Sequence, residues 1–335
     1  MTARPIAITM GEPAGIGSEL TLKAWMARHK DGAGFIALAD AELLAREADR
    51  LGLDISFGVT EDPSAALDIF PRALPVYHTP LTKHPDPGQP IAETASSVIS
   101  VIETAVQWAI DGQVDSIVTN PISKHVLYDA GFNHPGHTEF LAELSGADNP
   151  PVMMLACSGL RVVPVTTHVG LRQGLDILTS ELIIEQAALT HGALKRDFAI
   201  PHPRLAIAGL NPHAGEAGAM GSEENDIIIP AIKTLRSQDI DATGPEPPDT
   251  LFSKGKRQTY DVAICMYHDQ ALIPIKTLDF TGGVNITLGL PIVRTSPDHG
   301  TAFGIAGQGV ANPTSTIEAL RMAWRMAGGE LEGAA

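Results

Sequence analysis

The sequence is poor in cysteine and aromatic residues, and its basic side chains are outnumbered by acidic ones. It holds two cysteines, Cys157 and Cys265, in 335 residues. This count excludes a disulfide-stapled secreted domain and the paired cysteine spacing of a zinc ribbon. Both cysteines lie in apolar stretches, so we expect buried thiols in a reducing compartment.

Basic charge is scarce as well. Lys and Arg number 23 against 39 Asp and Glu, which gives a formal net charge of −16. A chain of this sign repels a phosphate backbone, so we expect no nucleic-acid partner. A small anionic ligand is still possible, because it requires only a few local cations.

Long apolar runs are absent. A membrane-spanning helix needs about 18 or more apolar residues, and Arg161 interrupts the apolar region 152–165, as Glu93 and Glu103 interrupt 91–108. The first residues also lack the apolar core of a signal peptide. We therefore expect a cytoplasmic protein with no membrane partner.

The sequence does contain short apolar runs that alternate with amphipathic helical patterns. Continuously apolar strands in such an alternation are typical of an α/β fold with helices on both faces of a parallel or mixed sheet, and the length suggests about two domains at roughly 150 residues each. The predicted strands are Ile6–Met10, Phe35–Ala39, Ser116–Thr119, Val152–Leu155, Val162–Thr166, Leu205–Gly209 and Val262–Met266. One predicted helix is capped by Asp40 and ends at Gly52. The other predicted helices are about Ser18–Arg28, 91–111, Glu139–Leu144, Glu181–Lys195, Glu223–Leu235 and Ser315–Met326. The predicted surface loops are Tyr77–Pro90 and Asp239–Pro248.

A glycine-rich turn, Gly11–Gly17, joins the first predicted strand to the first predicted helix. Its glycine spacing differs from GxGxxG, so the usual dinucleotide fingerprint is missing. Such a turn can still bring backbone N–H groups close to an anion. A simple tight turn between strand and helix explains it equally well.

Three histidines come just past the ends of predicted strands: His168, His213 and His268. Ligands of parallel sheets bind at the carboxyl ends of the strands. Three imidazoles gathered there could hold a divalent transition metal with open positions for a substrate. Three unrelated, hydrogen-bonded histidines are the alternative, and the residues alone leave both open.

Charged and polar residues mark further candidates. Lys276, Asn285 and Arg294 lie in an otherwise apolar, glycine-rich segment, where two cations suggest carboxylate or phosphate recognition. Thr138, next to His137, can cap a helix whose first N–H groups favour an anion. Two surface cations and ordinary helix capping are the alternatives.

Two acidic residues and one lysine complete the candidates. Asp249 and Asp269 could each act as a base, orient a histidine or contact a ligand amine. A helix cap for Asp249 and a supporting role for Asp269 are the alternatives. Lys124 follows a predicted strand and either faces a ligand or lies in solvent.

Eight distinctive segments follow one another over nearly the whole chain. They are ITMGEPAGIG at 8–17, TNPISK at 119–124, GHTEFLAEL at 136–144, TTHVGL at 166–171, GLNPHAGE at 209–216, DTLF at 249–252, YHDQALIPIK at 267–276 and GGVNITLGLPIVRTSPDHGTAF at 282–303. Together they resemble the 4-hydroxythreonine-4-phosphate dehydrogenase family. A single one would be weak, but the set is highly specific. Two small departures are Ser18, where we expect proline, and Gly304, where an acidic residue is common.

The resemblance implies a fold like that of isocitrate and isopropylmalate dehydrogenases, with two α/β/α domains around a cleft. The first domain would comprise residues 1–125 plus about 295–335. The second, about 126–294, would carry the metal ligands and the dimer contacts. It also implies a homodimer with the active site at the subunit interface.

The resemblance further assigns roles to the residues already singled out. It implies one divalent metal (zinc, cobalt, magnesium or manganese) on His168, His213 and His268, and NAD or NADP as cofactor. The implied substrate contacts are His137, Thr138, Lys276, Asn285 and Arg294. Asp249, Asp269 and Lys276 are the expected catalytic residues, with Asp269 or Lys276 as the base.

The implied reaction is oxidation of 4-phosphooxy-L-threonine to a β-keto acid, which decarboxylates to 3-amino-2-oxopropyl phosphate in pyridoxal phosphate biosynthesis. One alternative is a sister dehydrogenase acting on 4-phosphothreonate, 4-phosphoerythronate or a dihydrodiol carboxylate. Alternatives of other classes are a non-redox phosphate acyltransferase and a non-catalytic phosphate or metal sensor.

Overall fold

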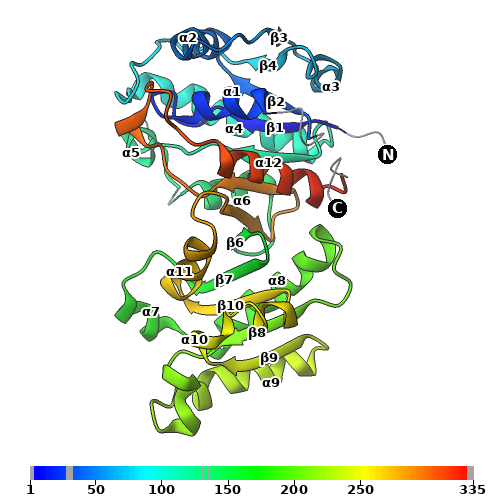
Figure 1. The fold of residues 1–335 in the computed structure, drawn as a ribbon, viewed down its shortest axis with the longest axis vertical. Helices are drawn as coiled ribbons and strands as arrows, with labels where there is room; N and C mark the ends of the chain where they lie inside the picture. The colour runs from blue at the N-terminus through cyan, green and yellow to red at the C-terminus, as the bar shows by residue number, and fades with distance from the viewer. Residues whose placement is uncertain (1–3, 28–32, 130, 135, 330–335) are drawn as a thin grey trace. The chain divides into compact units, whose positions relative to one another are not determined.

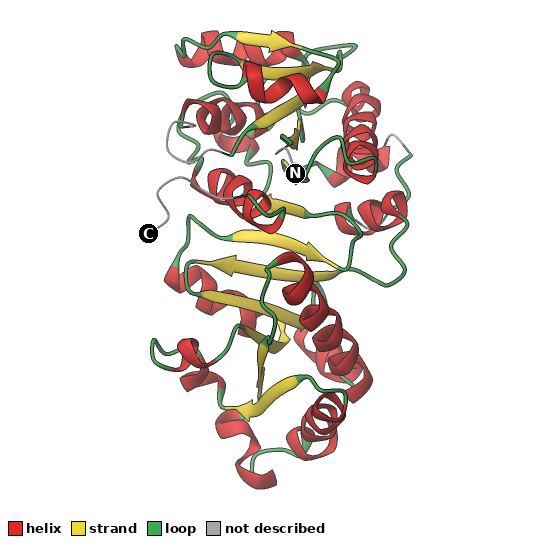
Figure 2. Ribbon diagram, turned by 90° about the vertical axis from the view of Figure 1, so that its right-hand side faces the viewer, coloured by secondary structure: helices red, strands yellow, loops and turns green. Residues whose placement is uncertain are grey.

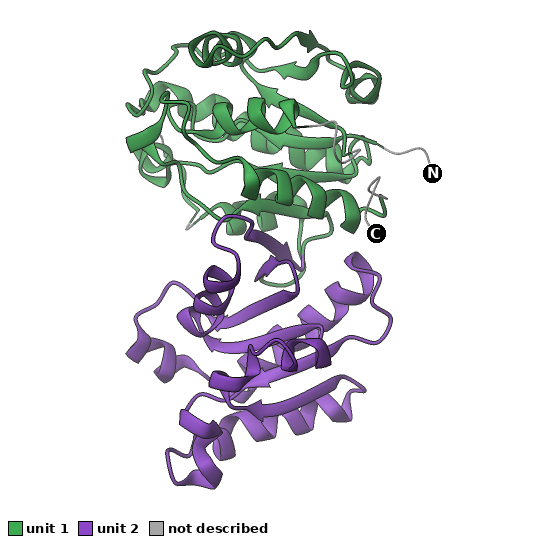
Figure 3. Ribbon diagram, in the orientation of Figure 1, with its two compact units in different colours: residues 1–151, 290–335 green, residues 152–289 purple. Residues whose placement is uncertain are grey.

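The computed structural model describes residues 4–27, 33–129, 131–134 and 136–329 (Figure 1). The chain forms two compact units, unit 1 of residues 1–151 and 290–335 and unit 2 of residues 152–289 (Figure 3). Within each unit, helices lie on both faces of a row of strands (Figure 2). The predicted α/β fold class is confirmed.

Unit 1 holds a row of parallel strands in the order β3-β4-β2-β1-β5-β12. The two central strands are entirely buried, as expected for apolar strands covered on both faces. Their bounds are β1 (Ile6–Thr9), β2 (Phe35–Ala39), β3 (Phe57–Val59), β4 (Leu74–His78), β5 (Ser116–Thr119) and β12 (Arg294–Pro297).

The helices of unit 1 begin and end largely where the sequence signals place them. The Asp40 side chain accepts hydrogen bonds from the N–H groups of Glu42 and Leu43, and Gly52 has φ +64° at the other end of the same helix. Arg28, the predicted end of the first helix, lies outside the described residues. The helices are α1 (Gly17–Met26), α2 (Ala41–Leu51), α3 (Ala66–Ile69), α4 (Ala95–Ile110), α5 (Lys124–Asp129), α6 (His137–Ser145) and α12 (Thr314–Met326).

Unit 2 holds strands in the order β11-β6-β7-β10-β8-β9, of which the first three pair antiparallel and the rest parallel. The strands are β6 (Val152–Cys157), β7 (Leu160–Thr166), β8 (Arg204–Ala208), β9 (Asp241–Glu246), β10 (Val262–Tyr267) and β11 (Val284–Leu288). The helices are α7 (Leu171–Ile177), α8 (Ser180–Asp197), α9 (Ile229–Ser237), α10 (Pro248–Leu251) and α11 (His268–Leu278).

Two predicted elements of unit 2 differ from the structure in part. The segment Asp239–Pro248 is not wholly a loop, because β9 within it pairs with β8 as the last strand of the row. Its Gly244 and Pro245 hide the strand pattern, and such residues are tolerated at a sheet edge. The predicted helix Glu223–Leu235 is divided, with a π-turn at Glu224–Ile228 before α9.

The boundaries of the units differ from the predicted domain boundaries. Residues 126–151 and 290–294 belong to unit 1. The physical reason is local packing: α6 packs on α4, and the N–H of Ile117 in β5 donates to the carbonyl of Val293. Among the described residues, no helix is both long and apolar enough to cross a membrane.

Candidate active site

Three neighbouring strands of unit 2 lead to the three predicted metal-binding histidines. β7 and β8 both pair in parallel with β10, so their carboxyl ends share one edge. His168 follows β7, His268 is the first residue of α11 after β10, and His213 lies four residues beyond the strand-end segment of β8 at Gly209. The structure thus places all three at the edge that the sequence predicts.

Two of the three imidazoles lie side by side. The ring centroids of His168 and His268 are 5.9 Å apart, at an interplanar angle of 46°. His168 has φ +51°, a left-handed conformation that is uncommon for a residue with a side chain. Both rings line a pocket of about 240 Å³ together with Thr166, Tyr267 and Asp269.

Asp269 orients one of these rings. Its Oδ1 is 2.7 Å from Nδ1 of His268. A carboxylate at that nitrogen favours the tautomer with the proton on Nδ1, which leaves the lone pair of Nε2 for a metal ion. The Asp269 side chain is 70% exposed, so its second oxygen remains accessible to a ligand.

His213 lies in a left-handed turn at residues 212–218 that breaks the ordinary helical geometry. Six consecutive residues have positive φ, from +55° at His213 to +98° at Gly218. Such a run is costly for residues with a Cβ, and it persists only where the surroundings fix it. His213 is exposed in this turn.

A buried carboxylate fixes the approach to that turn. Glu224 accepts hydrogen bonds from the N–H groups of Leu210 and Asn211, at 2.8 and 2.7 Å, and from Nδ2 of Asn211 at 2.9 Å. Burial acts to raise the pKa of Glu224, but these hydrogen bonds outweigh it and hold the pKa below its usual value. The carboxylate is therefore charged, and it stabilises the chain that leads to His213.

The side chain of Gln270 ties two of the strand ends together. Its Nε2 donates to the carbonyl of Gly209 at 2.8 Å, and its Oε1 accepts from the N–H of Met266 at 2.7 Å. Sequence reasoning missed both Glu224 and Gln270. The only signal for them is that each lies in or near a segment that carries a predicted histidine.

The structure does not gather a complete metal site in one chain. Among the described residues, no three His, Cys, Asp or Glu side chains are placed to hold a metal ion. The adjacent His168 and His268 rings, with Asp269 behind the second, fit part of a ligand set. The three-histidine metal site stays a prediction.

Unit 1 presents a second group of predicted residues, centred on Arg294 at the start of β12. This side chain is 4% exposed, and burial lowers its pKa to about 10, so it is still a cation at neutral pH. Its Nε and Nη2 donate to Oγ1 of Thr119 at the end of β5, at 3.1 and 2.6 Å. Thr119 is a partner that sequence reasoning did not single out, although it opens the segment TNPISK.

His137, the first residue of α6, belongs to the same group. Its pKa lies well below the usual value, chiefly because of burial and further because of the nearby cations Arg294 and Lys124. Its Nε2 is buried and has no hydrogen-bond partner among the described residues. Two cations and a buried, unsatisfied imidazole nitrogen at a helix N-terminus make a place suited to an anion.

The remaining predicted residues lie on four different elements. Thr138 does not cap α6, because the N-cap is Gly136 and no side chain caps the helix. Asp249 is exposed in α10, and Asn285 is half-buried in β11. Lys276, in the last turn of α11, has its Nζ 5.4 Å from the centroid of the Phe280 ring.

The model of the pyridoxal phosphate biosynthetic protein PdxA matches residues 32–323 of this chain. The chain belongs to the PdxA family. A PdxA relative from Caulobacter vibrioides, called 4-hydroxythreonine-4-phosphate dehydrogenase, is 51% identical over 98% of both chains.

Solved structures of PdxA relatives agree with this assignment. The 4-hydroxythreonine-4-phosphate dehydrogenase of Klebsiella pneumoniae has a TM-score of 0.88 and 38% identity, over 97% of this chain and all of that one. A terephthalate 1,2-cis-dihydrodiol dehydrogenase from Burkholderia xenovorans has a TM-score of 0.65 and 27% identity, over 98% of this chain and 99% of that one. The fold is therefore that of the PdxA dehydrogenases, as predicted, which is related to the isocitrate and isopropylmalate dehydrogenases.

Proposed function

We propose that this chain is a metal-dependent 4-hydroxythreonine-4-phosphate dehydrogenase of vitamin B6 biosynthesis. It would oxidise 4-phosphooxy-L-threonine to a β-keto acid, which then loses carbon dioxide to give 3-amino-2-oxopropyl phosphate. The observation that carries the proposal is the 51% identity, over nearly the whole chain, to a relative of that name. The two adjacent imidazoles beside Asp269 supply chemistry of the kind that the reaction needs.

His168, His213 and His268 would hold one divalent metal ion. Zinc, cobalt, magnesium and manganese are the candidates, of which imidazole ligands suit zinc and cobalt best. The bound metal supplies Lewis-acid polarisation of the hydroxyl that is oxidised. Asp269 keeps the His268 ring in the tautomer that presents Nε2, and Glu224 holds the segment that bears His213.

His137, Thr138, Lys276, Asn285 and Arg294 would bind the charged ends of the substrate. Arg294 and His137 are the strongest members of this set, since one is a buried cation and the other has a buried nitrogen without a partner among the described residues. A phosphate or carboxylate oxygen that accepts from both would offset the cost of their burial. The proton of the hydroxyl would pass to Asp269 or Lys276, and Asp249 is a further acidic candidate.

The cofactor would be NAD or NADP, whose nicotinamide accepts the hydride. The family implies a nicotinamide cofactor, and the choice between the two belongs to the proposal. We also propose a cytoplasmic homodimer in which the partner subunit completes the metal site. The incomplete ligand set of the single chain supports this arrangement.

The most specific experiment compares substrates with purified enzyme and added divalent metal. We expect kcat/KM for 4-phosphooxy-L-threonine to exceed that for 4-phosphothreonate, 4-phosphoerythronate and a dihydrodiol carboxylate, measured as formation of reduced cofactor. A preference for one of the others would identify a sister dehydrogenase. Acyl transfer to phosphate without cofactor reduction would identify an acyltransferase, and binding without turnover a sensor.

A further inference from the structure

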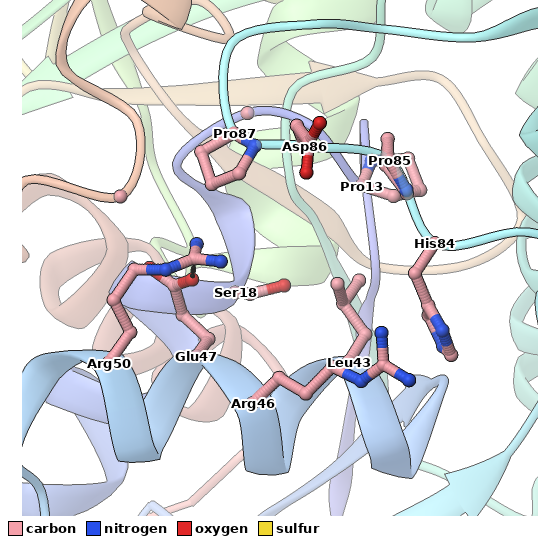
Figure 4. Close-up of a pocket in the computed structure, with 12 residues that line it drawn as sticks. Pro13, Ser18, Leu43, Arg46, Glu47, Arg50, His84, Pro85, Asp86 and Pro87 are labelled. Carbon is pink, nitrogen blue, oxygen red and sulfur yellow. Dashed lines mark hydrogen bonds and ion pairs between the residues drawn. The ribbon is translucent and has the colours of Figure 1, made fainter.

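A small pocket in unit 1 is lined by none of the residues assigned above to metal, substrate or catalysis. Four segments line it: residues 13–18 around the start of α1, helix α2, the stretch 84–87, and Gly307 (Figure 4). Its volume is about 80 Å³. Pockets for whole organic ligands are several times larger, at roughly 300–1,000 Å³, so this one suits a single compact group.

Ser18 is the clearest sign that something binds there. The residue is 6% exposed, and its Oγ has no hydrogen-bond partner among the described residues. Figure 4 shows the hydroxyl directed into the middle of the pocket. A buried hydroxyl without a partner costs free energy, and a ligand oxygen in the pocket would remove that cost.

The hydroxyl lies in the first turn of α1, a ten-residue helix whose N-cap, Ile16, provides no side-chain cap. The first N–H groups of a helix have no partners within the helix, and they favour negative charge. Ser18 and the N-terminus of α1 therefore offer donors from the same side.

Two cationic side chains, Arg46 and Arg50, line the pocket from successive turns of α2 (Figure 4). Arg46 is 60% exposed, and its Nη2 lies 4.0 Å from Oε2 of Glu42, a long ion pair. Arg50 uses Nη1 on Glu47 at 2.7 Å, which leaves further N–H groups of its fork for a ligand.

Two carboxylates, Glu47 and Asp86, also line the pocket, and their negative charge opposes the binding of an anion. Glu47 is neutralised in part by Arg50, its ion-pair partner. Arg46 and Arg50 balance the two carboxylates in formal charge, and the Ser18 hydroxyl and the start of α1 add uncharged donors. The site favours a ligand with several acceptor oxygens.

We propose that this pocket binds a phosphate-class oxyanion through Ser18, the first turn of α1, Arg46 and Arg50. The ligand is either a free phosphate ion or a phosphoryl group carried by a larger molecule such as a dinucleotide. The inference rests on the pocket alone and not on the proposed reaction.

The test is a calorimetric titration with inorganic phosphate at constant ionic strength, on the parent chain and on Arg46→Gln and Ser18→Ala. The control is Arg72→Gln, which removes an exposed arginine of the same unit. We expect each pocket substitution to weaken one phosphate-binding event about tenfold, as for a lost charge-assisted hydrogen bond. The control should bind as the parent does, and phosphate held by Arg294 and His137 should be unaffected.

A second arm separates the two sources of the phosphoryl group, using dissociation constants for NADP and NAD. If the group is the 2′-phosphate that NADP has and NAD lacks, Arg46→Gln weakens NADP about tenfold and leaves NAD unchanged. If the group is the pyrophosphate that both dinucleotides share, Arg46→Gln weakens both about tenfold. If free phosphate is the ligand, both dinucleotides bind as before and only the phosphate titration changes. Unaltered binding of phosphate and of NADP in both pocket variants would overturn the proposal.

Discussion

At the residue scale, the contact between Asp269 and His268 carries most of the chemistry proposed for unit 2. The 2.7 Å hydrogen bond fixes the tautomer and the orientation of the ring. His168, whose ring centroid is 5.9 Å away, has no comparable partner among the contacts described above. We therefore expect the His268 ring to be the better-ordered of the two ligands.

Asp269→Asn tests this contact. The amide keeps the shape but loses the charge that favours a proton on Nδ1, so we expect metal affinity to fall roughly 10- to 100-fold. Competition with a metal-sensitive chelating dye measures the affinity. Asp148→Asn, at an exposed position of unit 1, should change nothing. Equal affinities in both variants would contradict the role given to Asp269.

The depressed pKa of His137 predicts a pH dependence of folding stability. Its folded-state pKa lies below the ordinary value of about 6.5. As the pH falls below that value, His137 binds a proton in the unfolded chain but not in the folded chain, so the free energy of unfolding decreases. The slope from this residue is about 1.4 kcal/mol per pH unit until the folded pKa is reached.

His137→Gln should remove that contribution, so stability should fall less between pH 7 and pH 5 than in the parent. Urea unfolding at both pH values measures it. The control is His202→Gln, at an exposed position of unit 2, which should keep the parent's pH dependence. An unchanged loss of stability in His137→Gln would show that the ring is protonated in the folded protein.

Some residues of the site can be predicted from the sequence, and others cannot. The positions of His168, His213 and His268 follow from strand ends, because a short apolar run that stops at a polar residue is visible in the sequence. Thr119, Glu224 and Gln270 act through hydrogen bonds to segments far along the chain. No local sequence pattern marks such hydrogen-bond partners, so these three residues could not be predicted from the sequence.

At the element scale, the left-handed turn around His213 is the most unusual piece of backbone near the site. Gly215 within it has φ +76°, and a Cβ there would lie 2.4 Å from Oε2 of Glu224. Both the backbone conformation and the space therefore require glycine. The turn and the Glu224 carboxylate form one packed arrangement.

Gly215→Ala should destabilise the protein by about 1–3 kcal/mol and weaken metal binding, because the turn and Glu224 must shift apart. Gly192→Ala is a matched control, since nothing lies within 4 Å of its added Cβ in the exposed face of α8. That change should be neutral or stabilising by up to about 1 kcal/mol. Urea unfolding compares the two, and equal stabilities would contradict the packing described for the turn.

Other elements show where the hydrophobic pattern of the sequence predicts secondary structure correctly and where it does not. β1, β2, β5 and β10 are continuous apolar runs, and the sequence predicts them to within a residue or so. β9, β11 and β12 contain or adjoin glycine or proline, so their pairing partners rather than their own residues define them. The π-turn at 224–228 likewise serves a tertiary contact, the hydrogen bonds of Glu224.

At the scale of the whole molecule, the net charge of −16 and the proposed anionic ligands have to be reconciled. Among the described residues, the cations near the proposed ligand sites form two small groups. Arg294 and Lys124 lie near His137, and Arg46 and Arg50 line the pocket beside Ser18. Helix N-termini add partial positive charge at both. Under the proposals above, these local donors, of which Arg294 is buried, would bind small phosphorylated molecules despite the negative net charge of the chain.

The central claim is that this chain oxidises 4-phosphooxy-L-threonine only with a divalent metal bound. The most direct measurement is the absorbance of reduced cofactor in enzyme stripped by a chelator, then reloaded with zinc, cobalt, magnesium or manganese, with His213→Ala treated in parallel. We expect no reduced cofactor from stripped enzyme, recovery on reloading with at least one metal, and no recovery in a folded His213→Ala. Full activity of the stripped enzyme, or of His213→Ala, would contradict the account.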